Sequence, residues 1–281
     1  MPELPEVETI ARGLHKRVAG DTIQSVWLGE KPEPLKSPPE EIVAVLEHSR
    51  IEQVRRIGKH IVFDLVRTDS NRRGEPQQEQ WIVHLGMTGR MQVTTQDVEI
   101  ARHTHAIVKL ASGREMRFVD PRRFGRLAVS ARSEGLSAGF SAPGDEPLES
   151  RAERFVELFR GRKTPIKSAL LNQKLLSGVG NIYADESLFR AGIRPRRRAA
   201  SLTREQLRKL HVAVQEVLRE AIALGGSSIS DYVDADGKEG FFQLQHRVYG
   251  REGEPCLVCK TPVKRVVIAG RSSHYCPYCQ K

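Results

Sequence analysis

Four cysteines fall in the last 26 residues, as the pairs Cys256-Leu-Val-Cys259 and Cys276-Pro-Tyr-Cys279. Each C-x-x-C pair supplies two thiolates from one tight turn, and the sixteen residues between the pairs are long enough for a two-stranded hairpin that returns the second pair to the first. Four thiolates complete a tetrahedral Zn²⁺ shell, so the spacing predicts one structural zinc ion. Two disulfides or a redox pair are the competing interpretations, which a cytosolic chain without a βαβ pattern around the cysteines disfavours.

A second motif lies in the segment 173–186, where Gly178 and Gly180 precede Asn181. The two glycines allow a tight turn, and Asn181 is placed to open a helix. Backbone N–H groups at such a turn and helix start can cradle a phosphate. An inter-helix turn that merely needs glycine is the alternative, and this motif alone does not overrule it.

The charge of the chain is unevenly distributed. The formal net charge is +10, but residues 1–150 carry 21 basic and 22 acidic side chains, whereas residues 151–281 carry 24 and 13. The whole excess therefore lies in the second half, as expected of a polyanion-binding domain joined to a nearly neutral one. A solvated basic surface that maintains solubility is the alternative.

Length and composition limit the classes of protein to consider. A chain of 281 residues, with 39% hydrophobic and 28% charged residues, suits two globular domains and excludes collagen-like, low-complexity or fully disordered chains. No apolar run reaches 18 residues, and the N-terminus carries acids where a signal peptide has its basic and apolar regions. We therefore expect no membrane partner and a cytoplasmic location.

The elements that must position these residues differ between the two halves. Apolar residues at steps of three and four predict one amphipathic helix that begins near Pro5 and ends before Gly20. From there to about residue 132 the apolar runs are short and bounded by turn residues, which predicts about eight strands and hence a sandwich or barrel. The predicted strands are 22–28, 51–57, 60–66, 81–85, 90–94, 105–110, 115–119 and 126–129.

After residue 132 the pattern changes. Residues 133–147 are rich in Gly, Ser and Pro and are typical of a linker. Beyond it the apolar period is helical. The longest predicted helix opens with a Thr203 to Gln206 capping box and stops at Gly225-Gly226.

Several motifs in one order resemble bacterial formamidopyrimidine-DNA glycosylases of the formamidopyrimidine-DNA glycosylase and endonuclease VIII family. They are PELPEVETIARGL at the start, GKH at 58–60, HLGMTGRM at 84–91, DPRRFGR at 120–126, LLNQKLLSGVGNIYADESLFRAGI at 170–193, DADGKEGFFQ at 234–243 and the cysteine ribbon. The resemblance runs from the second residue to the last. It implies a base-excision repair enzyme that removes oxidised purines from duplex DNA and then nicks the strand by β- and δ-elimination.

The resemblance also implies an α+β fold in four parts. An N-terminal helix and β-sandwich form the catalytic domain at 1–132, followed by a linker at 133–150. A helix-two-turns-helix domain with a lesion-recognition loop occupies 151–245, and a four-cysteine zinc finger occupies 246–281. The chain is expected to act as a monomer on damaged double-stranded DNA, at the nucleoid of a bacterial cytoplasm.

The catalytic residues that the resemblance implies begin with Pro2. Once Met1 is removed, Pro2 presents a secondary α-amine, and because α-amines titrate near about pH 8 a useful fraction is the free nucleophile. Glu3 is implied as the acid or base for ring opening and later proton transfers, and Glu6 as support for the same pocket. For both, ordinary acids favoured by the helix dipole are the alternative. Lys59 is implied to reach a phosphate beside the lesion.

Base excision from a duplex requires the target base to be flipped out and the gap to be filled. The resemblance implies Met87 as an apolar plug, Phe124 as an aromatic wedge and Arg122 as the partner of the orphaned cytosine, although Met87 and Phe124 taken alone suit a hydrophobic core. The implied phosphate contacts are His103, Arg123, Asn181 and Arg271.

Two rival functions are considered. An endonuclease VIII-like preference for oxidised pyrimidines is disfavoured by PELPE, by Arg122 with Phe124, and by the long loop 227–240. A non-catalytic DNA-binding zinc protein would leave Pro2 and its neighbouring acid without a role. One departure from the family is Asn172, where aspartate is frequent, and it affects no catalytic assignment.

Overall fold

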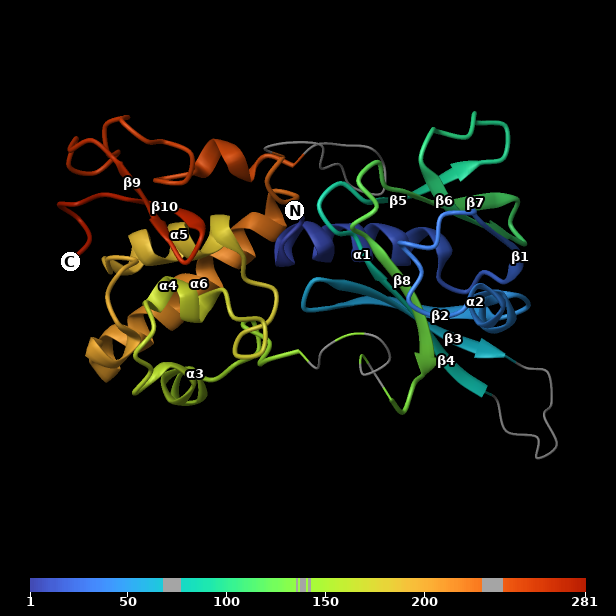
Figure 1. Ribbon diagram of the computed structural model, residues 1–281, viewed down its shortest axis with the longest axis horizontal. Helices are drawn as coiled ribbons and strands as arrows, with labels where there is room; N and C mark the ends of the chain where they lie inside the picture. The colour runs from blue at the N-terminus through green and yellow to red at the C-terminus, as the bar shows by residue number, and fades with distance from the viewer. Residues whose placement is uncertain (68–76, 135, 137–139, 141–142, 229–239) are drawn as a thin grey trace. The chain divides into compact units, whose positions relative to one another are not determined.

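The computed structural model describes residues 1–67, 77–134, 136, 140, 143–228 and 240–281 (Figure 1). The chain divides into two compact units. The first unit comprises Met1–Pro2, Glu6–Ala142 and Ser227–Gly240, and the second comprises Glu3–Pro5, Pro143–Gly226 and Phe241–Lys281.

Eight strands in the first unit form two antiparallel four-stranded sheets. The order β1-β6-β7-β5 joins β1 (Ile23–Leu28), β6 (Thr104–Leu110), β7 (Arg114–Val119) and β5 (Arg90–Thr95). The order β2-β3-β4-β8 joins β2 (Arg50–Ile57), β3 (His60–Arg67), β4 (Gln77–His84) and β8 (Arg126–Ala131). Apolar residues of both sheets share one buried core, so the fold is a sandwich. All eight predicted strands are confirmed.

The N-terminal helix α1 (Leu4–Val18) supplies one wall of this core. Val7, Ile10 and Leu14 fall on one face of the helix and are at most 2% exposed, together with Val18. The predicted helix is confirmed. Figure 1 shows α1 running alongside the strands of the sandwich.

A short helix, α2 (Pro39–Leu46), was not predicted. Its start carries the usual signals, because Pro39 occupies the first helical position and Glu40 and Glu41 follow in the first turn. Ile42 and Leu46, one turn apart, join the sandwich core. The eight residues of α2 are too few to show a clear helical period in the sequence.

The second unit is helical around its own core. Its helices are α3 (Ala152–Phe159), α4 (Ile166–Leu170), α5 (Asn181–Ala191) and α6 (Arg204–Ala223). The core includes Phe155, Phe159 and Tyr183, all fully buried. The Thr203 to Gln206 capping box is present with both hydrogen bonds, at 3.1 Å and 3.0 Å. The helical half is thus confirmed.

A two-stranded antiparallel hairpin closes the second unit. It consists of β9 (Lys264–Ile268) and β10 (Arg271–Tyr275). The two turn residues, Ala269 and Gly270, both have positive φ, at 47° and 75°, as a tight hairpin turn requires. The hairpin that the cysteine spacing predicts between the two pairs is confirmed.

Part of the predicted linker, and residues 229–239 of the predicted recognition loop, lie outside the described residues. Among the residues that are described, no helix combines the length and the apolar character needed to cross a membrane.

Candidate functional site

Glu3 lies buried at the N-terminal end of α5, within the second unit. Its carboxylate accepts N–H groups of Ile182 at 3.1 Å and Tyr183 at 3.5 Å. A helix N-terminus carries unpaired N–H donors and a partial positive charge, both of which favour a carboxylate. The helix-start amides that the sequence offered to a phosphate are therefore used by a side chain of the protein itself.

The two glycines before α5 are required by this packing. A Cβ atom at Gly180 would lie 2.2 Å from the carboxylate carbon of Glu3, where no atom fits. Gly178 has a φ of +87°, and its added Cβ would lie 2.8 Å from the Leu4 side chain. The backbone N–H of Leu4 donates to the Gly178 carbonyl at 3.0 Å. Together these contacts fix the direction in which Glu3 enters the helix end.

Pro2 and Glu6 belong to the first unit. Pro2 is buried, and Met1 before it is 50% exposed. Glu6 is 2% exposed and accepts the backbone N–H of Ser227 at 2.7 Å. An acid that is favoured only by the helix dipole would be exposed to solvent, whereas Glu6 is buried and makes a charge-assisted hydrogen bond. Glu6 thereby holds the first residue of the predicted recognition loop.

Lys59 occupies the turn between β2 and β3 and is only 8% exposed, unlike an ordinary surface lysine. Gly58 before it has a φ of 58°, and Arg56 donates to the Gly58 carbonyl at 3.0 Å. Burial lowers the pKa of His60 to about 4 and that of His84 to about 3, and the positive charge of Lys59 adds to both shifts. Both imidazoles are therefore neutral at physiological pH.

Asp120 joins two turns of the first unit, between β4 and β5 and between β7 and β8. One carboxylate oxygen accepts the Thr88 hydroxyl at 2.6 Å and the Arg122 N–H at 3.2 Å, and the other accepts the Gly125 N–H at 2.7 Å. A Cβ atom at Gly86 would lie 2.5 Å from the backbone of Phe124. The two turns are thus in direct backbone contact.

These joined turns present the predicted gap-filling residues. Met87 is 41% exposed and Phe124 is 51% exposed, so neither belongs to the hydrophobic core. The Arg122 guanidinium lies 4.9 Å from the centre of the Phe124 ring, a cation–π contact. The structure therefore brings Met87, Arg122 and Phe124 together on one exposed edge of the sandwich.

His103 and Arg123 lie exposed beside that edge. Both have left-handed backbone conformations, with φ of 67° and 58°, which are uncommon for residues other than glycine. The backbone of Asp120 stabilises both, because its N–H donates to the His103 carbonyl at 3.0 Å and its carbonyl accepts the Arg123 N–H at 3.3 Å. Arg123 also pairs with Glu33 at 2.7 Å.

In the second unit, Asn181 and Arg271 occupy neighbouring positions. The Asn181 side-chain amide donates to the Ser272 hydroxyl at 3.4 Å, and Arg271 precedes Ser272 at the start of β10. Arg271 is exposed. The start of α5 therefore contacts the start of β10, the strand that carries Arg271.

A buried ion pair fixes β10 to the helices of the second unit. The Lys167 ammonium lies 2.7 Å from the Asp185 carboxylate and donates to the Ser272 carbonyl at 2.6 Å. Asp185 also accepts the backbone N–H of His274 at 2.8 Å. Lys167 and Asp185 are both fully buried, and burial lowers the pKa of Lys167 against the opposing effect of Asp185.

The next carboxylate along α5 holds another segment. Glu186 accepts three consecutive backbone N–H groups, from Arg247, Val248 and Tyr249, at 2.8 Å to 3.0 Å. Burial raises the pKa of Glu186, and the three N–H donors act in the opposite direction. Helix α5 therefore binds Glu3 through the amides at its N-terminal end. Its two acidic residues, Asp185 and Glu186, bind β10 and residues 247–249.

The four cysteines converge, with sulfur atoms all within 4.8 Å of one another. The Cys256 and Cys279 sulfurs are 3.9 Å apart, and those of Cys259 and Cys276 are 3.4 Å apart. Four Zn–S bonds of about 2.3 Å in a tetrahedron place sulfurs about 3.8 Å apart, so the four thiols fit zinc and leave no open position. The cofactor prediction is confirmed.

Comparisons with known proteins give one consistent result. The formamidopyrimidine-DNA glycosylase N-terminal domain matches residues 1–127, the formamidopyrimidine-DNA glycosylase H2TH domain matches 144–233, and the zinc finger found in FPG and IleRS matches 253–281. The chain belongs to the formamidopyrimidine-DNA glycosylase family. It is a DNA-repair glycosylase with a zinc finger.

Two curated formamidopyrimidine-DNA glycosylases illustrate the extent of the likeness. That of Solibacter usitatus is 44% identical over 281 residues, and that of Listeria monocytogenes is 39% identical over 285 residues. Both alignments cover 100% of each chain. The family resemblance that the sequence motifs indicated is confirmed.

Solved structures of the family have the same fold. A complex of a Lactococcus lactis Fpg variant with DNA containing Fapy-dG superimposes with a TM-score of 0.89 at 33% identity, covering 100% of both chains. The Fpg of Thermus thermophilus gives 0.85 at 43% identity, covering 99% of this chain and 98% of that one. The predicted α+β architecture is confirmed.

Sequence reasoning missed two buried charged residues, Asp120 and Lys167, that hold the segments carrying the candidate residues in place. Asp120 stands directly after a buried strand and two positions before a pair of arginines, and this place in the DPRRFGR motif was the available signal. Lys167 gave no signal, since in the sequence it is one basic residue among many. Its partner Asp185 lies 18 residues away, on another helix.

Proposed function

We propose that this protein removes oxidised purines, 8-oxoguanine and formamidopyrimidines, from duplex DNA and then cleaves the strand by β- and δ-elimination. The observation that carries the proposal is the buried Glu3 carboxylate, bound by the amides that open α5 and adjacent in the chain to Pro2. The likeness to glycosylases bound to Fapy-dG DNA and to DNA with an abasic site supports it.

Pro2 is the nucleophile in this proposal. After Met1 is removed, the free secondary amine attacks sugar C1′ and forms the C1′–N bond, and the base leaves with the electron pair of the glycosidic bond. The amine then loses its proton, the C1′–O4′ bond breaks as O4′ takes up a proton, and the open sugar is left as an iminium. This iminium is a fixed cation, because the proline nitrogen has no proton left to lose. This cation acidifies the C2′ hydrogen and so promotes elimination of the 3′ phosphate.

Three residues support this chemistry. Glu3 transfers protons during opening of the sugar ring and during elimination. Glu6 holds the start of the loop 227–240 through Ser227. Lys59 binds a phosphate beside the lesion, and its burial makes the ammonium a stronger electrostatic partner than an exposed lysine would be.

The joined turns fill the gap left by the flipped base. Phe124 enters the stack as a wedge, Met87 occupies the vacated space, and Arg122 donates to the orphaned cytosine. Contacts to phosphates hold the strand on either side. We assign these contacts to His103, Arg123, Asn181 and Arg271.

The zinc finger has a positioning role. Bound by Cys256, Cys259, Cys276 and Cys279, the metal holds the two ends of the hairpin together. The hairpin carries Arg271. The metal takes no part in the reaction, because all of its positions are filled by sulfur.

The organisation of the chain follows the same proposal. The catalytic domain is 1–132, the linker 133–150, the helix-two-turns-helix domain with its loop 151–245, and the zinc finger 246–281. The protein works as a monomer on damaged double-stranded DNA, in the bacterial cytoplasm at the nucleoid. An endonuclease VIII-like activity on oxidised pyrimidines is the nearest rival.

Trapping with borohydride tests the proposal directly. Borohydride present during reaction with an 8-oxoguanine duplex is expected to reduce the iminium and leave the N-terminal peptide covalently attached to DNA. Retention of Met1 is expected to prevent trapping, because Pro2 nitrogen is then a tertiary amide. Glu3→Gln is expected to slow it.

The outcomes separate the candidate functions. A crosslink that maps to Lys59, or one that forms with Met1 retained, would overturn the assignment of Pro2. Faster trapping on a thymine glycol duplex than on an 8-oxoguanine duplex favours the pyrimidine rival. No crosslink on either duplex, with zinc bound and tight DNA binding, favours a non-catalytic DNA-binding protein.

A further inference from the structure

Trp27 is a large aromatic side chain that the proposed reaction does not use. It lies on β1, an edge strand of its sheet, and is 49% exposed. The other tryptophan of the chain, Trp81, is 1% exposed in the sandwich core. An exposed tryptophan leaves a large apolar surface in contact with water, a cost that a binding role would offset.

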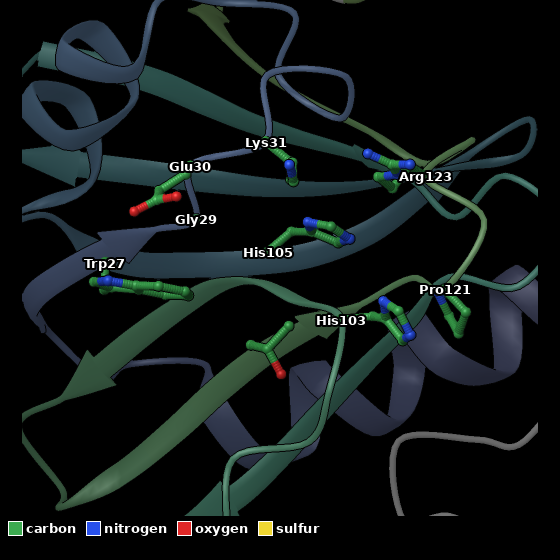
Figure 2. Close-up of a pocket in the computed structure, with 9 residues that line it drawn as sticks. Trp27, Gly29, Glu30, Lys31, His103, His105, Pro121 and Arg123 are labelled. Atoms are coloured by element: carbon green, nitrogen blue, oxygen red, sulfur yellow. The ribbon is translucent and has the colours of Figure 1, made fainter.

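The Trp27 ring lines an open pocket of about 480 Å³ in the first unit. The ring edge lies near Gly29, where an added Cβ atom would be 3.5 Å from it. Figure 2 shows Trp27 on one side of the pocket, His103, Pro121 and Arg123 on the other, and His105 between them. This volume suits a ligand of nucleotide size.

Basic side chains from three separate segments line the same pocket. Lys31 follows β1, His103 precedes β6, and Arg123 lies between β7 and β8. One carboxylate, that of Glu30, also lines it, and Figure 2 shows this carboxylate directed away from Lys31. Arg123 pairs with Glu33, but this ion pair is 43% and 48% exposed and can be exchanged for a phosphate at little cost.

The far side of the pocket is held rigidly. The Asp120 carbonyl lies 3.0 Å from the His105 ring nitrogen and also accepts the Arg123 N–H, while the Asp120 N–H fixes His103. Two of these residues keep left-handed backbone conformations. Strained backbone that the surroundings hold in place is concentrated at binding sites. The basic groups are therefore presented in a fixed arrangement.

We propose that this pocket binds one unpaired nucleotide, with its base stacked on Trp27 and its phosphate bound by Lys31 and Arg123. A flat aromatic ring beside basic side chains is the arrangement that binds a nucleotide without reading its sequence. The site goes beyond excision of the flipped lesion, which needs neither Trp27 nor Lys31. The nucleotide is either free or part of a single strand, and the experiment separates these sources.

The tryptophans provide the measurement. Deoxyadenosine 5′-monophosphate, titrated into the full chain at low salt, is expected to quench Trp27 emission in a saturable way. In Trp27→Phe only buried Trp81 emits, and no quenching is expected. Deoxyadenosine without phosphate is expected to bind more weakly, and deoxyribose 5-phosphate, which has no base to stack, is expected to quench little.

Two variants test the assigned contacts. Lys31→Ala is expected to weaken binding of the nucleotide by about tenfold, as loss of a charge-assisted hydrogen bond does. Lys36→Ala is the matched control, because Lys36 is a lysine close in sequence that does not line this pocket. Trp27→Ala is expected to weaken nucleotide binding by a similar factor, which calorimetry measures because this variant lacks the reporting tryptophan.

The source of the nucleotide follows from a second titration. A single-stranded tetranucleotide that binds more than about tenfold tighter than the mononucleotide identifies a strand as the ligand, and equal binding identifies the free nucleotide. No saturable quenching at millimolar concentration, or quenching that Lys31→Ala leaves unchanged, overturns the proposal.

This inference and the proposed function fail separately. Trp27→Ala and Lys31→Ala are expected to nick an 8-oxoguanine duplex at the unmodified rate. If the nucleotide does not quench the emission but the duplex is nicked normally, only the nucleotide-site inference is rejected. Quenching without nicking in the unmodified chain removes only the proposed function.

Discussion

At the scale of single residues, the contact between Gly180 and Glu3 shows how little room the site has. A methyl group at residue 180 would overlap the Glu3 carboxylate, at 2.2 Å from its carbon atom. Gly180→Ala is therefore expected to push the carboxylate away from the Ile182 amide. Since general acid and base catalysis contributes about 100-fold or more, base release in single-turnover assays is expected to fall by that factor.

A matched substitution controls for the change itself. Gly161 also belongs to the second unit and has open space around it, but its φ of +77° makes alanine strained. Gly161→Ala is expected to cost about 1 kcal/mol of stability and to leave base release unchanged. Equal activity of Gly180→Ala and Gly161→Ala would contradict the role assigned to Glu3.

The buried histidines predict a dependence of stability on pH. The pKa of His60 is about 4 in the folded protein against an ordinary value of 6.5, so between these values the unfolded chain binds a proton that the folded chain does not. The contribution of His60 to the free energy of unfolding is therefore complete above pH 6.5 and falls as the pH drops toward 4. His60 alone accounts for up to about 3 kcal/mol.

Urea unfolding at about pH 7 and at about pH 4.5, on either side of the ordinary histidine pKa, measures this effect. His60→Phe is expected to reduce the loss, because its ring already packs against the Phe140 ring, with centroids 4.6 Å apart, and phenylalanine takes up no proton. His84 keeps its own share, since its pKa of about 3 is lower still. If His60→Phe loses as much stability between the two pH values as the unmodified protein does, His60 does not titrate in this range.

The four cysteines could be predicted from the sequence, because they stand within short patterns whose spacing is itself informative. Pro2 and Lys59 also stand within short motifs, and their roles remain predictions. Asp120 and Lys167 also bond to residues 32 and 105 positions away, respectively, and the sequence does not show such distant pairings. Their roles follow only from the folded chain.

At the scale of elements, the buried pair of Lys167 on α4 and Asp185 on α5 attaches β10 to the helices, because Lys167 donates to the Ser272 carbonyl and Asp185 accepts the His274 N–H. Lys167→Met is expected to destabilise the second unit by about 3 to 5 kcal/mol, because it leaves the Asp185 charge buried without the opposite charge of the ammonium. Urea unfolding of the full chain measures the loss.

The control is another ion pair on the same helix. Arg190 pairs with Glu220 at 2.6 Å, but both side chains are substantially exposed. Arg190→Met is expected to cost under about 1 kcal/mol. If both substitutions cost the same, the buried pair does not stabilise the attachment of β10.

Elements with a long apolar period or alternation were predictable, and short or polar ones were not. The strands and α6 follow from their apolar patterns, whereas α2 has only two buried positions to show. The attachment of β10 and of residues 247–249 to the helices is set by buried charges on α4 and α5. Such polar contacts leave no hydrophobic pattern in the sequence.

At the scale of the whole molecule, each unit has a core of its own, and zinc contributes to only one of them. Removal of the metal is expected to unfold the hairpin, because a two-stranded hairpin is marginal alone. DNA binding is then lost with Arg271, while the sandwich stays folded.

Tryptophan emission distinguishes these two effects. Trp27 and Trp81 both lie in the first unit, so their emission is expected to stay constant during chelation while DNA affinity falls. Tight binding by the zinc-free protein, or a shift in emission, would contradict this prediction. The separation of charge between the halves had indicated the two units, although it could not show that Glu3–Pro5 belong with the second.

That assignment of Glu3–Pro5 has a consequence for biosynthesis. Glu3 and Leu4 are held by Ile182 and Gly178, which lie almost 180 positions further along the chain. A ribosome makes the N-terminus first, so these hydrogen bonds of Glu3 and Leu4 cannot form until the chain has been made as far as the start of α5. The nascent end is therefore free during the period in which Met1 has to be cleaved. The segment 178–182, made much later, binds the residues that were made first.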